Sequence, residues 1–275
     1  MTSFQRRRKC GGKDHTLWLH EGDGNTRFFH SQATHRFRHN RIEVLENSRG
    51  ERCEEERDLA NILIEFYDNL FSSSIPIQIE VALEATPLVN TAEMNNELST
   101  PFQRSEVDLA LKQMNPLKAL GPDGMPPLFF QQFWPTIGEE VAEAVLNCLN
   151  SGMIPHSINH TFITLIPKVK SPVKVLEFCP IALCNTLYKI ISKVLANRLK
   201  KILPSVILES QSAFQSSKAI SNNILVAFET LHHTKSQKSK NTGFMAMKLD
   251  MRKTYDRVER EFLIKIMKKM GFCDK

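Results

Sequence analysis

The sequence predicts an α+β fold that is rich in helices and contains few strands. Apolar residues recur at helical spacing in several long segments, most regularly from Leu187 to Ile202. Strand-like apolar runs are short and few, and the clearest are 161–167 and 244–250. With 41% hydrophobic and 24% charged residues, the 275-residue chain has the composition of a globular protein of one or two domains.

The N-terminal third is expected to hold a hairpin, one long helix and a connecting region. A turn at 47–50 predicts a short hairpin after Arg41. Three glutamates at 54–56 favour a helix start, and apolar residues at helical spacing extend this helix to residue 71. Prolines recur within 72–103, which we interpret as a connecting region with at most short helices.

Helices are expected to dominate the remainder of the chain. Ser105 is a suitable cap for a helix over 106–114. Gly121-Pro-Asp-Gly124 predicts a tight turn, because proline presets the backbone at the second position and glycine relieves crowding at the fourth. Further helices are predicted from Pro126 to Gly152, with Pro135 expected to kink or divide it, and over 187–202, 218–234 and 257–270.

Positive charge is concentrated near the N-terminus. The formal net charge is +6, and residues 1–49 hold ten Lys and Arg against five acidic residues. Aromatic rings lie among these charges, and this combination suits phosphates and stacked bases. The residues predicted to contact nucleic acid are Arg27, Phe28, Phe29, Arg36, Arg38 and Arg41. For residues 1–13, a solvated and partly disordered basic tail is the simpler interpretation.

Membrane and zinc-binding classes are disfavoured by composition. No apolar run approaches the roughly 20 residues of a membrane-spanning helix, so no membrane partner is expected. The six cysteines are far apart, which favours reduced thiols in an intracellular protein, nuclear or cytoplasmic. His30, His35 and His39 lie between Cys10 and Cys53, but the tight ligand pairs of structural zinc sites are absent, so zinc is not expected.

Eight short motifs occur in a fixed order along the chain. They are Glu21-Gly-Asp-Gly-Asn-Thr-Arg-Phe-Phe-His30, Ala119-Leu-Gly-Pro-Asp-Gly124, Leu165-Ile-Pro-Lys168, Pro180-Ile-Ala-Leu-Cys-Asn185, Tyr188-Lys-Ile-Ile-Ser-Lys193, Gln211-Ser-Ala-Phe214, Asn223-Ile-Leu-Val-Ala-Phe-Glu229 and Lys248-Leu-Asp-Met251. From about Leu17 onward, the chain resembles the reverse transcriptase of plant LINE-type (non-LTR) retrotransposons. One such motif is weak, but eight in family order are specific.

The resemblance implies a truncated right-hand polymerase fold with helix-rich fingers and an incomplete palm. Its expected parts are a basic, partly disordered linker over 1–40, a pre-fingers hairpin and helix with a connecting region over 41–103, a fingers-like region over 104–243, and the first palm strand and helix over 244–275. The family activity is RNA-directed DNA polymerisation, a nucleotidyl transfer that uses Mg²⁺, an RNA template and a DNA primer.

Asp250 is the residue on which the polymerase interpretation depends. Two Mg²⁺ ions can stabilise the attacking and leaving oxygens of nucleotidyl transfer, and Mg²⁺ prefers oxygen ligands. The resemblance implies that Asp250 is catalytic and binds metal, together with the backbone carbonyl of Met251. It also implies that the Tyr255 ring lies beneath the sugar and excludes a 2′-hydroxyl. The alternatives are a helix cap for Asp250 and core packing for Tyr255.

Two lysines and one cysteine occupy positions that the family uses for the triphosphate. The resemblance implies that Lys168 and Lys218 contact the incoming nucleotide, although an exposed charge after a strand is the simpler interpretation of Lys168. The family usually has an arginine immediately before the Pro-Ile pair, where this chain has Cys179. Cysteine supplies neither a positive charge nor a bidentate donor, so we interpret Cys179 as a degenerate position.

The sequence contains no Asp-Asp pair, although the family carries one in an aromatic-x-Asp-Asp turn. Because one aspartate cannot hold two divalent ions against water, we expect this chain to be inactive as an isolated polymerase. Two alternatives stay open: a non-catalytic RNA- or DNA-binding remnant, and a translated repeat fragment without function.

Overall fold

The computed structural model describes residues 34–35, 40–73, 79–208, 210–211, 219–236, 247, 249 and 254–274. Within these residues the chain forms helices and two small antiparallel sheets, in agreement with the predicted α+β class. The chain divides into two units, each built from segments that are separated in sequence. The first unit comprises 1–68 with 102–194, and the second comprises 69–101 with 195–275.

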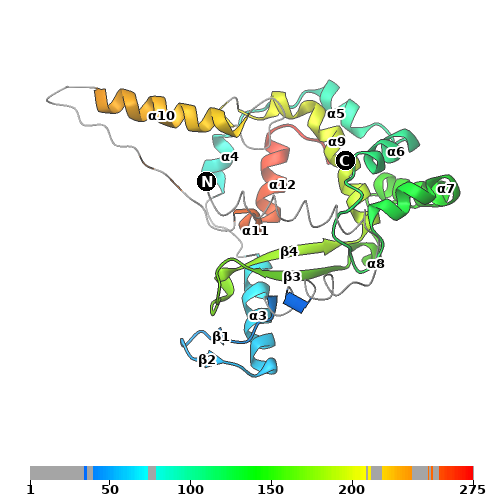
Figure 1. Cartoon of the computed structure of the whole chain (residues 1–275). Coiled ribbons are helices and arrows are strands. Elements are labelled where there is room, and N and C mark those ends of the chain that lie inside the picture. Colours follow the sequence, from blue (N-terminus) through cyan, green and yellow to red (C-terminus); the bar gives the residue numbers. More distant parts are fainter. Residues whose placement is uncertain are drawn as a thin grey trace. The chain divides into compact units, whose positions relative to one another are not determined.

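A short hairpin and a helix begin the described part of the first unit. Strands β1 (Leu45–Glu46) and β2 (Arg52–Cys53) pair antiparallel, which confirms the predicted hairpin. The Asn47 side-chain oxygen accepts hydrogen bonds from the backbone amides of Arg49 and Glu51, at 2.9 and 3.0 Å, and so shapes the turn. Helix α3 (Glu56–Phe71) follows, as predicted (Figure 1).

A longer hairpin dominates the strand content of this unit. Strand β3 (Thr161–Pro167) was predicted, whereas its partner β4 (Phe178–Cys184) was not. Pro180 weakens the strand signal of β4, because proline has no backbone amide to donate. A two-stranded sheet tolerates it, since each strand has one edge without a partner strand. Leu165 and Phe178 pack with Leu45, Val175 and the apolar face of α3, namely Leu59, Ile62, Leu63 and Phe66.

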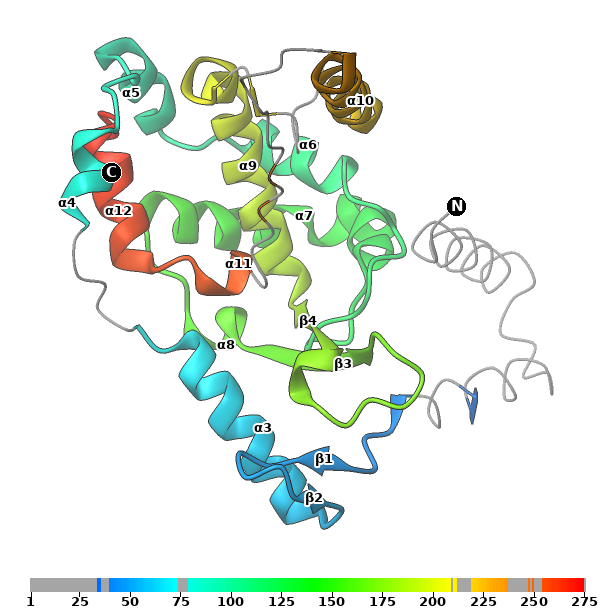
Figure 2. The same ribbon diagram turned by 90° about the vertical axis from the view of Figure 1, so that its left-hand side faces the viewer.

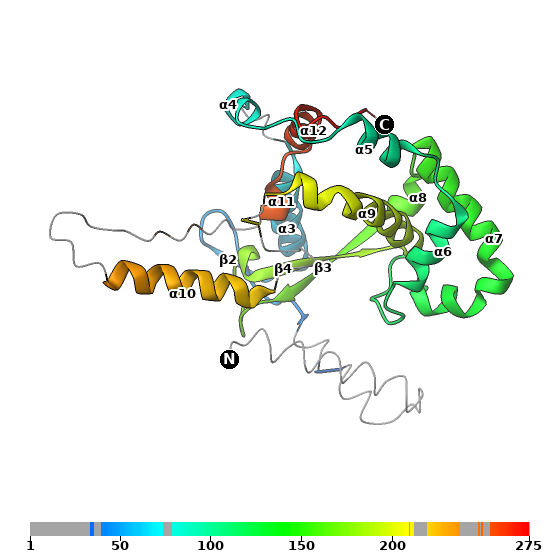
Figure 3. The same cartoon turned by 90° about the horizontal axis from the view of Figure 1, so that it is seen from above.

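The larger core of the first unit is helical. Helices α6 (Arg104–Lys112), α7 (Pro127–Ser151) and the beginning of α9 (Thr186–Val206) enclose it, and the short helix α8 (His156–Asn159) precedes β3 (Figure 3). Its buried residues are Val107, Ala110, Leu111, Met114, Phe130, Ala142, Val145, Cys148, Ile190, Ile191 and Val194. Burial of this apolar surface is the main stabilising contribution available to the unit.

Two details of these helices differ from the prediction. Helix α6 begins at Arg104 rather than after Ser105, because the Gln103 backbone amide donates to the Glu106 carboxylate at 2.8 Å. Helix α7 continues through Pro135, so the predicted division is absent, and a kink there stays a prediction. Pro135 is exposed, so water can reach the carbonyl that loses its amide partner there.

The second unit contains the end of α9 together with several shorter helices. These are α4 (Glu80–Glu84), α5 (Ala92–Ser99), α10 (Ile220–Ser236), α11 (Thr254–Arg257) and α12 (Arg260–Lys269). The helix predicted over 257–270 corresponds to α12, which begins three residues later, whereas the short helix α11 was not predicted. The region 72–103 holds only short helices in its described part, as predicted.

Residues 88–101, which we call the strap, hold the C-terminal end of α12. The backbone amides of Val89 and Asn90 donate to the Met270 carbonyl at 3.1 and 2.9 Å. The Asn95 side chain donates to the Gly271 carbonyl at 2.7 Å and accepts from the Cys273 amide at 3.1 Å. Figure 2 shows α12 beside α4, with α5 near the C-terminal end of α12. The strap therefore pairs carbonyls that the C-terminal end of a helix leaves without a partner, and one amide of the segment that follows.

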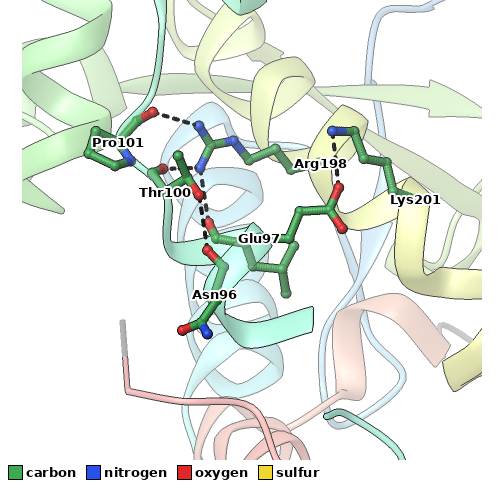
Figure 4. Close-up of polar contacts among 7 residues, drawn as sticks. Asn96, Glu97, Thr100, Pro101, Arg198 and Lys201 are labelled. Atoms are coloured by element: carbon green, nitrogen blue, oxygen red, sulfur yellow. Dashed lines mark hydrogen bonds and ion pairs between the residues drawn. The ribbon is translucent and has the colours of Figure 1, made fainter. Parts of the chain in front are cut away.

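Arg198 joins the strap to α9. Its guanidinium is buried, with the residue 8% exposed, and donates to the carbonyls of Leu98, Thr100 and Pro101 (Figure 4). These acceptors lie at or just after the C-terminal end of α5, where a positive charge also complements the helix dipole. Beside it, the exposed Lys201 pairs with Glu97 at 3.3 Å.

Candidate functional site

The β3–β4 hairpin places Lys168 and Cys179 near the same end. Cys179 pairs with Ile166, and the next pair, Pro167 with Phe178, is buried in the core. Because successive residues of a strand alternate between faces, Ile166 and Cys179 lie on the opposite, outer face. Lys168 directly follows β3 and is exposed, and its backbone amide donates to the Glu177 carbonyl at 2.8 Å.

The loop between the two strands is ordered by its own hydrogen bonds. The Glu177 carboxylate accepts from the backbone amides of Val173 and Lys174, at 2.8 and 3.1 Å. The hydrogen bond from the Lys174 backbone amide, and to a smaller extent the one from the Val173 amide, holds the pKa of Glu177 below its ordinary value. The Glu46 amide donates to the Val173 carbonyl at 2.7 Å, which connects the loop to β1. Lys168 is thus presented from a loop with defined backbone contacts.

At the other end of the hairpin, the turn Gly121–Gly124 contacts the junction of β4 and α9. The Asp123 carboxylate accepts from the Thr186 backbone amide at 2.8 Å, and the Asp123 amide donates to the Asn185 side chain at 3.0 Å. The Thr186 hydroxyl donates to the Met125 carbonyl at 2.7 Å. Two of the eight motifs identified in the sequence are therefore in direct contact, which sequence spacing alone did not reveal.

Close packing reinforces this contact. A side-chain carbon at Gly121 would lie 2.2 Å from the Cys184 carbonyl oxygen, so only glycine fits without a shift of the backbone. The Lys189 ammonium donates to the Ala119 carbonyl at 2.6 Å. Burial lowers the pKa of Lys189, while the negative charge of Asp123 acts in the opposite direction.

Tyr255 belongs to α11 in the second unit and is exposed, with 83% of its surface accessible. Arg41 precedes β1 and is exposed. The other predicted site residues lie outside the described residues: Arg27, Phe28, Phe29, Arg36, Arg38, Lys218, Asp250 and Met251. The predicted strand 244–250 also lies outside them, apart from Met247 and Leu249.

Neither a metal cluster nor a membrane-spanning helix is found among the described residues. Within the described ranges, no group of three or more His, Cys, Asp and Glu side chains is arranged to hold a metal ion. None of the helices in the described part of the chain combines the length and apolar character needed to cross a bilayer.

Comparison with known proteins identifies the C-terminal part of the chain. Residues 166–275 match the family model described as reverse transcriptase (RNA-dependent DNA polymerase). This segment carries a reverse transcriptase domain. The matched range begins within β3 and includes Lys168, Cys179, Lys218, Asp250, Met251 and Tyr255.

A transposon protein is similar over nearly the whole chain. The chain is 28% identical over 254 residues to a protein of Xenopus laevis named "Transposon TX1 uncharacterized 149 kDa protein". The alignment covers 91% of this chain and 19% of the frog protein. The chain therefore spans about a fifth of the length of that relative.

Proposed function

We propose that this chain supplies the fingers and the first palm segment of an RNA-directed DNA polymerase from a LINE-type (non-LTR) retrotransposon. The observation that supports this most directly is the reverse transcriptase match, which contains every nucleotide-site residue predicted from the sequence. Similarity to a transposon protein over 91% of the chain supports the retrotransposon origin. The plant origin suggested by the motifs stays a prediction.

Within this proposal, the outer face of the β3–β4 hairpin meets the incoming nucleoside triphosphate. Lys168 offers an exposed ammonium next to that face, and an ammonium is a suitable partner for phosphate oxygens. Cys179 lies on the face itself and brings no charge. Tyr255 would contact the sugar, and its exposed ring is compatible with a ligand contact.

Mg²⁺ is the metal expected at Asp250, with the Met251 carbonyl as a further oxygen ligand. When bound, it would stabilise negative charge on the reacting phosphate. The chemistry of the donor set does not fit a complete two-metal centre, since Asp250 is the one carboxylate predicted to bind metal and the sequence has no Asp-Asp pair. We therefore propose that the 275-residue chain binds nucleic acid but does not extend a primer by itself.

The proposed partners are an RNA template and a DNA primer. The N-terminal segment, with ten Lys and Arg in residues 1–49, would contribute contacts to phosphates. A non-catalytic nucleic-acid-binding role is the second candidate, and the same excess of positive charge favours it. The two candidates differ in whether any primer extension accompanies binding.

The test measures binding and extension on one substrate. We expect the purified chain to bind a labelled RNA–DNA primer-template with an affinity that falls steeply with salt, and to extend no primer with Mg²⁺ or Mn²⁺. The triple variant R27A/R36A/R38A should lower the salt slope by about 2–3, because each lost phosphate contact removes about 0.7–0.9. The triple Arg→Lys variant, which keeps the charge, should retain most of the slope.

Three results would contradict parts of this proposal. Primer extension that Asp250→Ala abolishes would show that the chain is an active polymerase by itself. Absence of binding at low salt would remove both nucleic-acid roles. Equal slopes for the alanine and lysine variants would assign binding to another part of the chain.

A further inference from the structure

At the base of the β3–β4 hairpin, Asn185 and Asp123 connect the end of β4 to two other segments of the first unit. These segments are the short helix α8 and the turn Gly121–Gly124. Asn185 donates from its side chain to the carbonyls of Ser157 and Ile158, at 2.8 and 3.1 Å, just before β3 begins. The same side chain accepts from the Asp123 amide. The start of β3 and the end of β4 therefore meet at a single buried point, held by the turn that contains Asp123.

Asp123 pairs a buried backbone amide in this contact. Thr186 is fully buried, and its amide lies in the first turn of α9, where a backbone amide has no partner within the helix. The Asp123 carboxylate supplies that partner at 2.8 Å and places a negative charge at the N-terminus of a 21-residue helix. Removing it would leave a buried donor unpaired at the place where β4 becomes α9.

The position of this contact has consequences for the opposite end of the hairpin. Strands β3 and β4 are paired over all seven residues of each, from Thr161 with Cys184 to Pro167 with Phe178. A paired ribbon of this kind transmits a change of direction at its base to its far end. Lys168 and Cys179 lie at that far end.

We propose that Asp123 is a positioning residue, which orients the β3–β4 hairpin through Thr186 and Asn185 and so sets where Lys168 meets a nucleoside triphosphate. The last step rests on the proposed function. The orientation of the hairpin itself depends on hydrogen bonds and apolar packing within the first unit alone. The two steps can therefore be tested separately in the full chain.

Native cysteines report on the first step. Cys184 ends β4 beside Gly121, whereas Cys148 is buried in the helical core, and mass spectrometry resolves their alkylation by iodoacetamide. We expect Asp123→Ala to accelerate alkylation of Cys184 about tenfold while Cys148 stays protected, because the lost hydrogen bond raises local opening. Asp123→Asn keeps an acceptor oxygen for the Thr186 amide and should restore most of the protection. Glu140→Ala, an exposed acid-to-alanine change on α7, is the charge-matched control.

Photolabelling with 8-azido-dATP reports on the second step. At a subsaturating concentration, Asp123→Ala should lower labelling of the peptides spanning 166–179 by about threefold or more, because small displacements weaken oriented contacts. Asp123→Asn should again recover most of the signal. A role in local stability alone would accelerate Cys184 alkylation and leave the labelling unchanged.

The outcomes separate the inference from the proposed function. Wild-type chain without labelling at 166–179 refutes the triphosphate role of the hairpin, while the Cys184 rates still test its orientation. If Asp123→Ala and Glu140→Ala have the same rate of Cys184 alkylation and the same labelling of 166–179, the inference is overturned. If Asp123→Ala exposes Cys148 as well, Lys189→Met takes its place, since it removes the bond to Ala119 and the positive charge that interacts with Asp123. Faster Cys184 alkylation with Cys148 protected then supports the inference, and an unchanged rate overturns it.

Discussion

Cys179 lies on the outer face of a β-hairpin, one residue beyond a fully buried phenylalanine. Its neighbours on that face, Ile166 and Ile181, are exposed and apolar. Within residues 161–184, the positive charges lie at one end of the hairpin, on Lys168, Lys170 and Lys174. At the scale of single residues, the face proposed to meet the triphosphate thus has lysines at its end and an uncharged residue at position 179.

We expect Cys179→Arg to strengthen triphosphate binding. A guanidinium at this position would add charge-assisted hydrogen bonds to phosphate oxygens, so photolabelling of the hairpin by 8-azido-dATP should reach half saturation at a concentration about tenfold lower. Cys179→Lys adds the same charge without the bidentate geometry and should give a smaller gain. Cys179→Ser is the neutral control, and a gain equal to that of Arg in this variant would contradict the proposed role.

At the scale of elements, the two ends of helix α5, which lies within the strap, show how a short helix becomes ordered. Helix α5 has eight residues and no buried side chain, so packing contributes little to it. Its N-terminal end is capped by the Thr91 hydroxyl, which accepts from the Met94 amide at 3.3 Å. Its C-terminal end is held by Arg198 from another helix. Hydrogen bonds at both termini therefore replace the apolar face that longer helices use.

Arg198→Ala should destabilise the second unit strongly. The change removes a buried guanidinium that donates to three carbonyls of the strap, so we expect a loss of about 2–4 kcal/mol in the free energy of unfolding. Lys201→Ala, one turn further along α9, removes only an exposed ion pair and should cost at most about 0.5 kcal/mol. Urea titrations, with hydrogen exchange of the α5 amides as the signal, measure the loss in the free energy of unfolding for both variants. Similar losses in the two variants would show that Arg198 does not hold the strap.

Elements also show where sequence patterns were sufficient. Helix α9 was predicted because its apolar residues repeat over several turns, and it extends only a few residues beyond the predicted end. The strand β4 was missed because Pro180 interrupts its pattern, and its pairing partner lies on the far side of a loop. Helix periodicity is a local property, whereas strand pairing depends on residues distant in sequence.

At the scale of the whole molecule, the two units do not coincide with the family match. The matched range 166–275 contributes to both units. Helices α6 and α7, which supply most of the larger core, lie before it. The strap also lies before it, yet it holds the end of α12 and contacts Arg198. The reverse transcriptase segment of this chain is thus stabilised by residues that the family model does not cover.

A polypeptide of residues 166–275 should therefore fail to unfold cooperatively. It would expose Ile190, Ile191 and Val194, and it would leave Arg198 without its acceptors. Residues 40–275, which keep both cores, should show one or two sigmoidal transitions in near-ultraviolet circular dichroism on heating. A cooperative transition of the shorter polypeptide would contradict this dependence. Lack of any transition in the longer one would favour a translated fragment without stable structure.

The sequence alone determined the helical character of the chain, its basic N-terminal segment and, through ordered motifs, its likeness to reverse transcriptases. Helical periodicity and local charge depend on residues close together in the chain, and the likeness depends on the order of the motifs along it. The tertiary structure decided that Lys168 and Cys179 share one end of a hairpin, that Asp123 serves α9 from another segment, and that the strap holds α12. Each of these depends on a hydrogen bond or strand pairing between distant residues, which only the folded chain brings within reach.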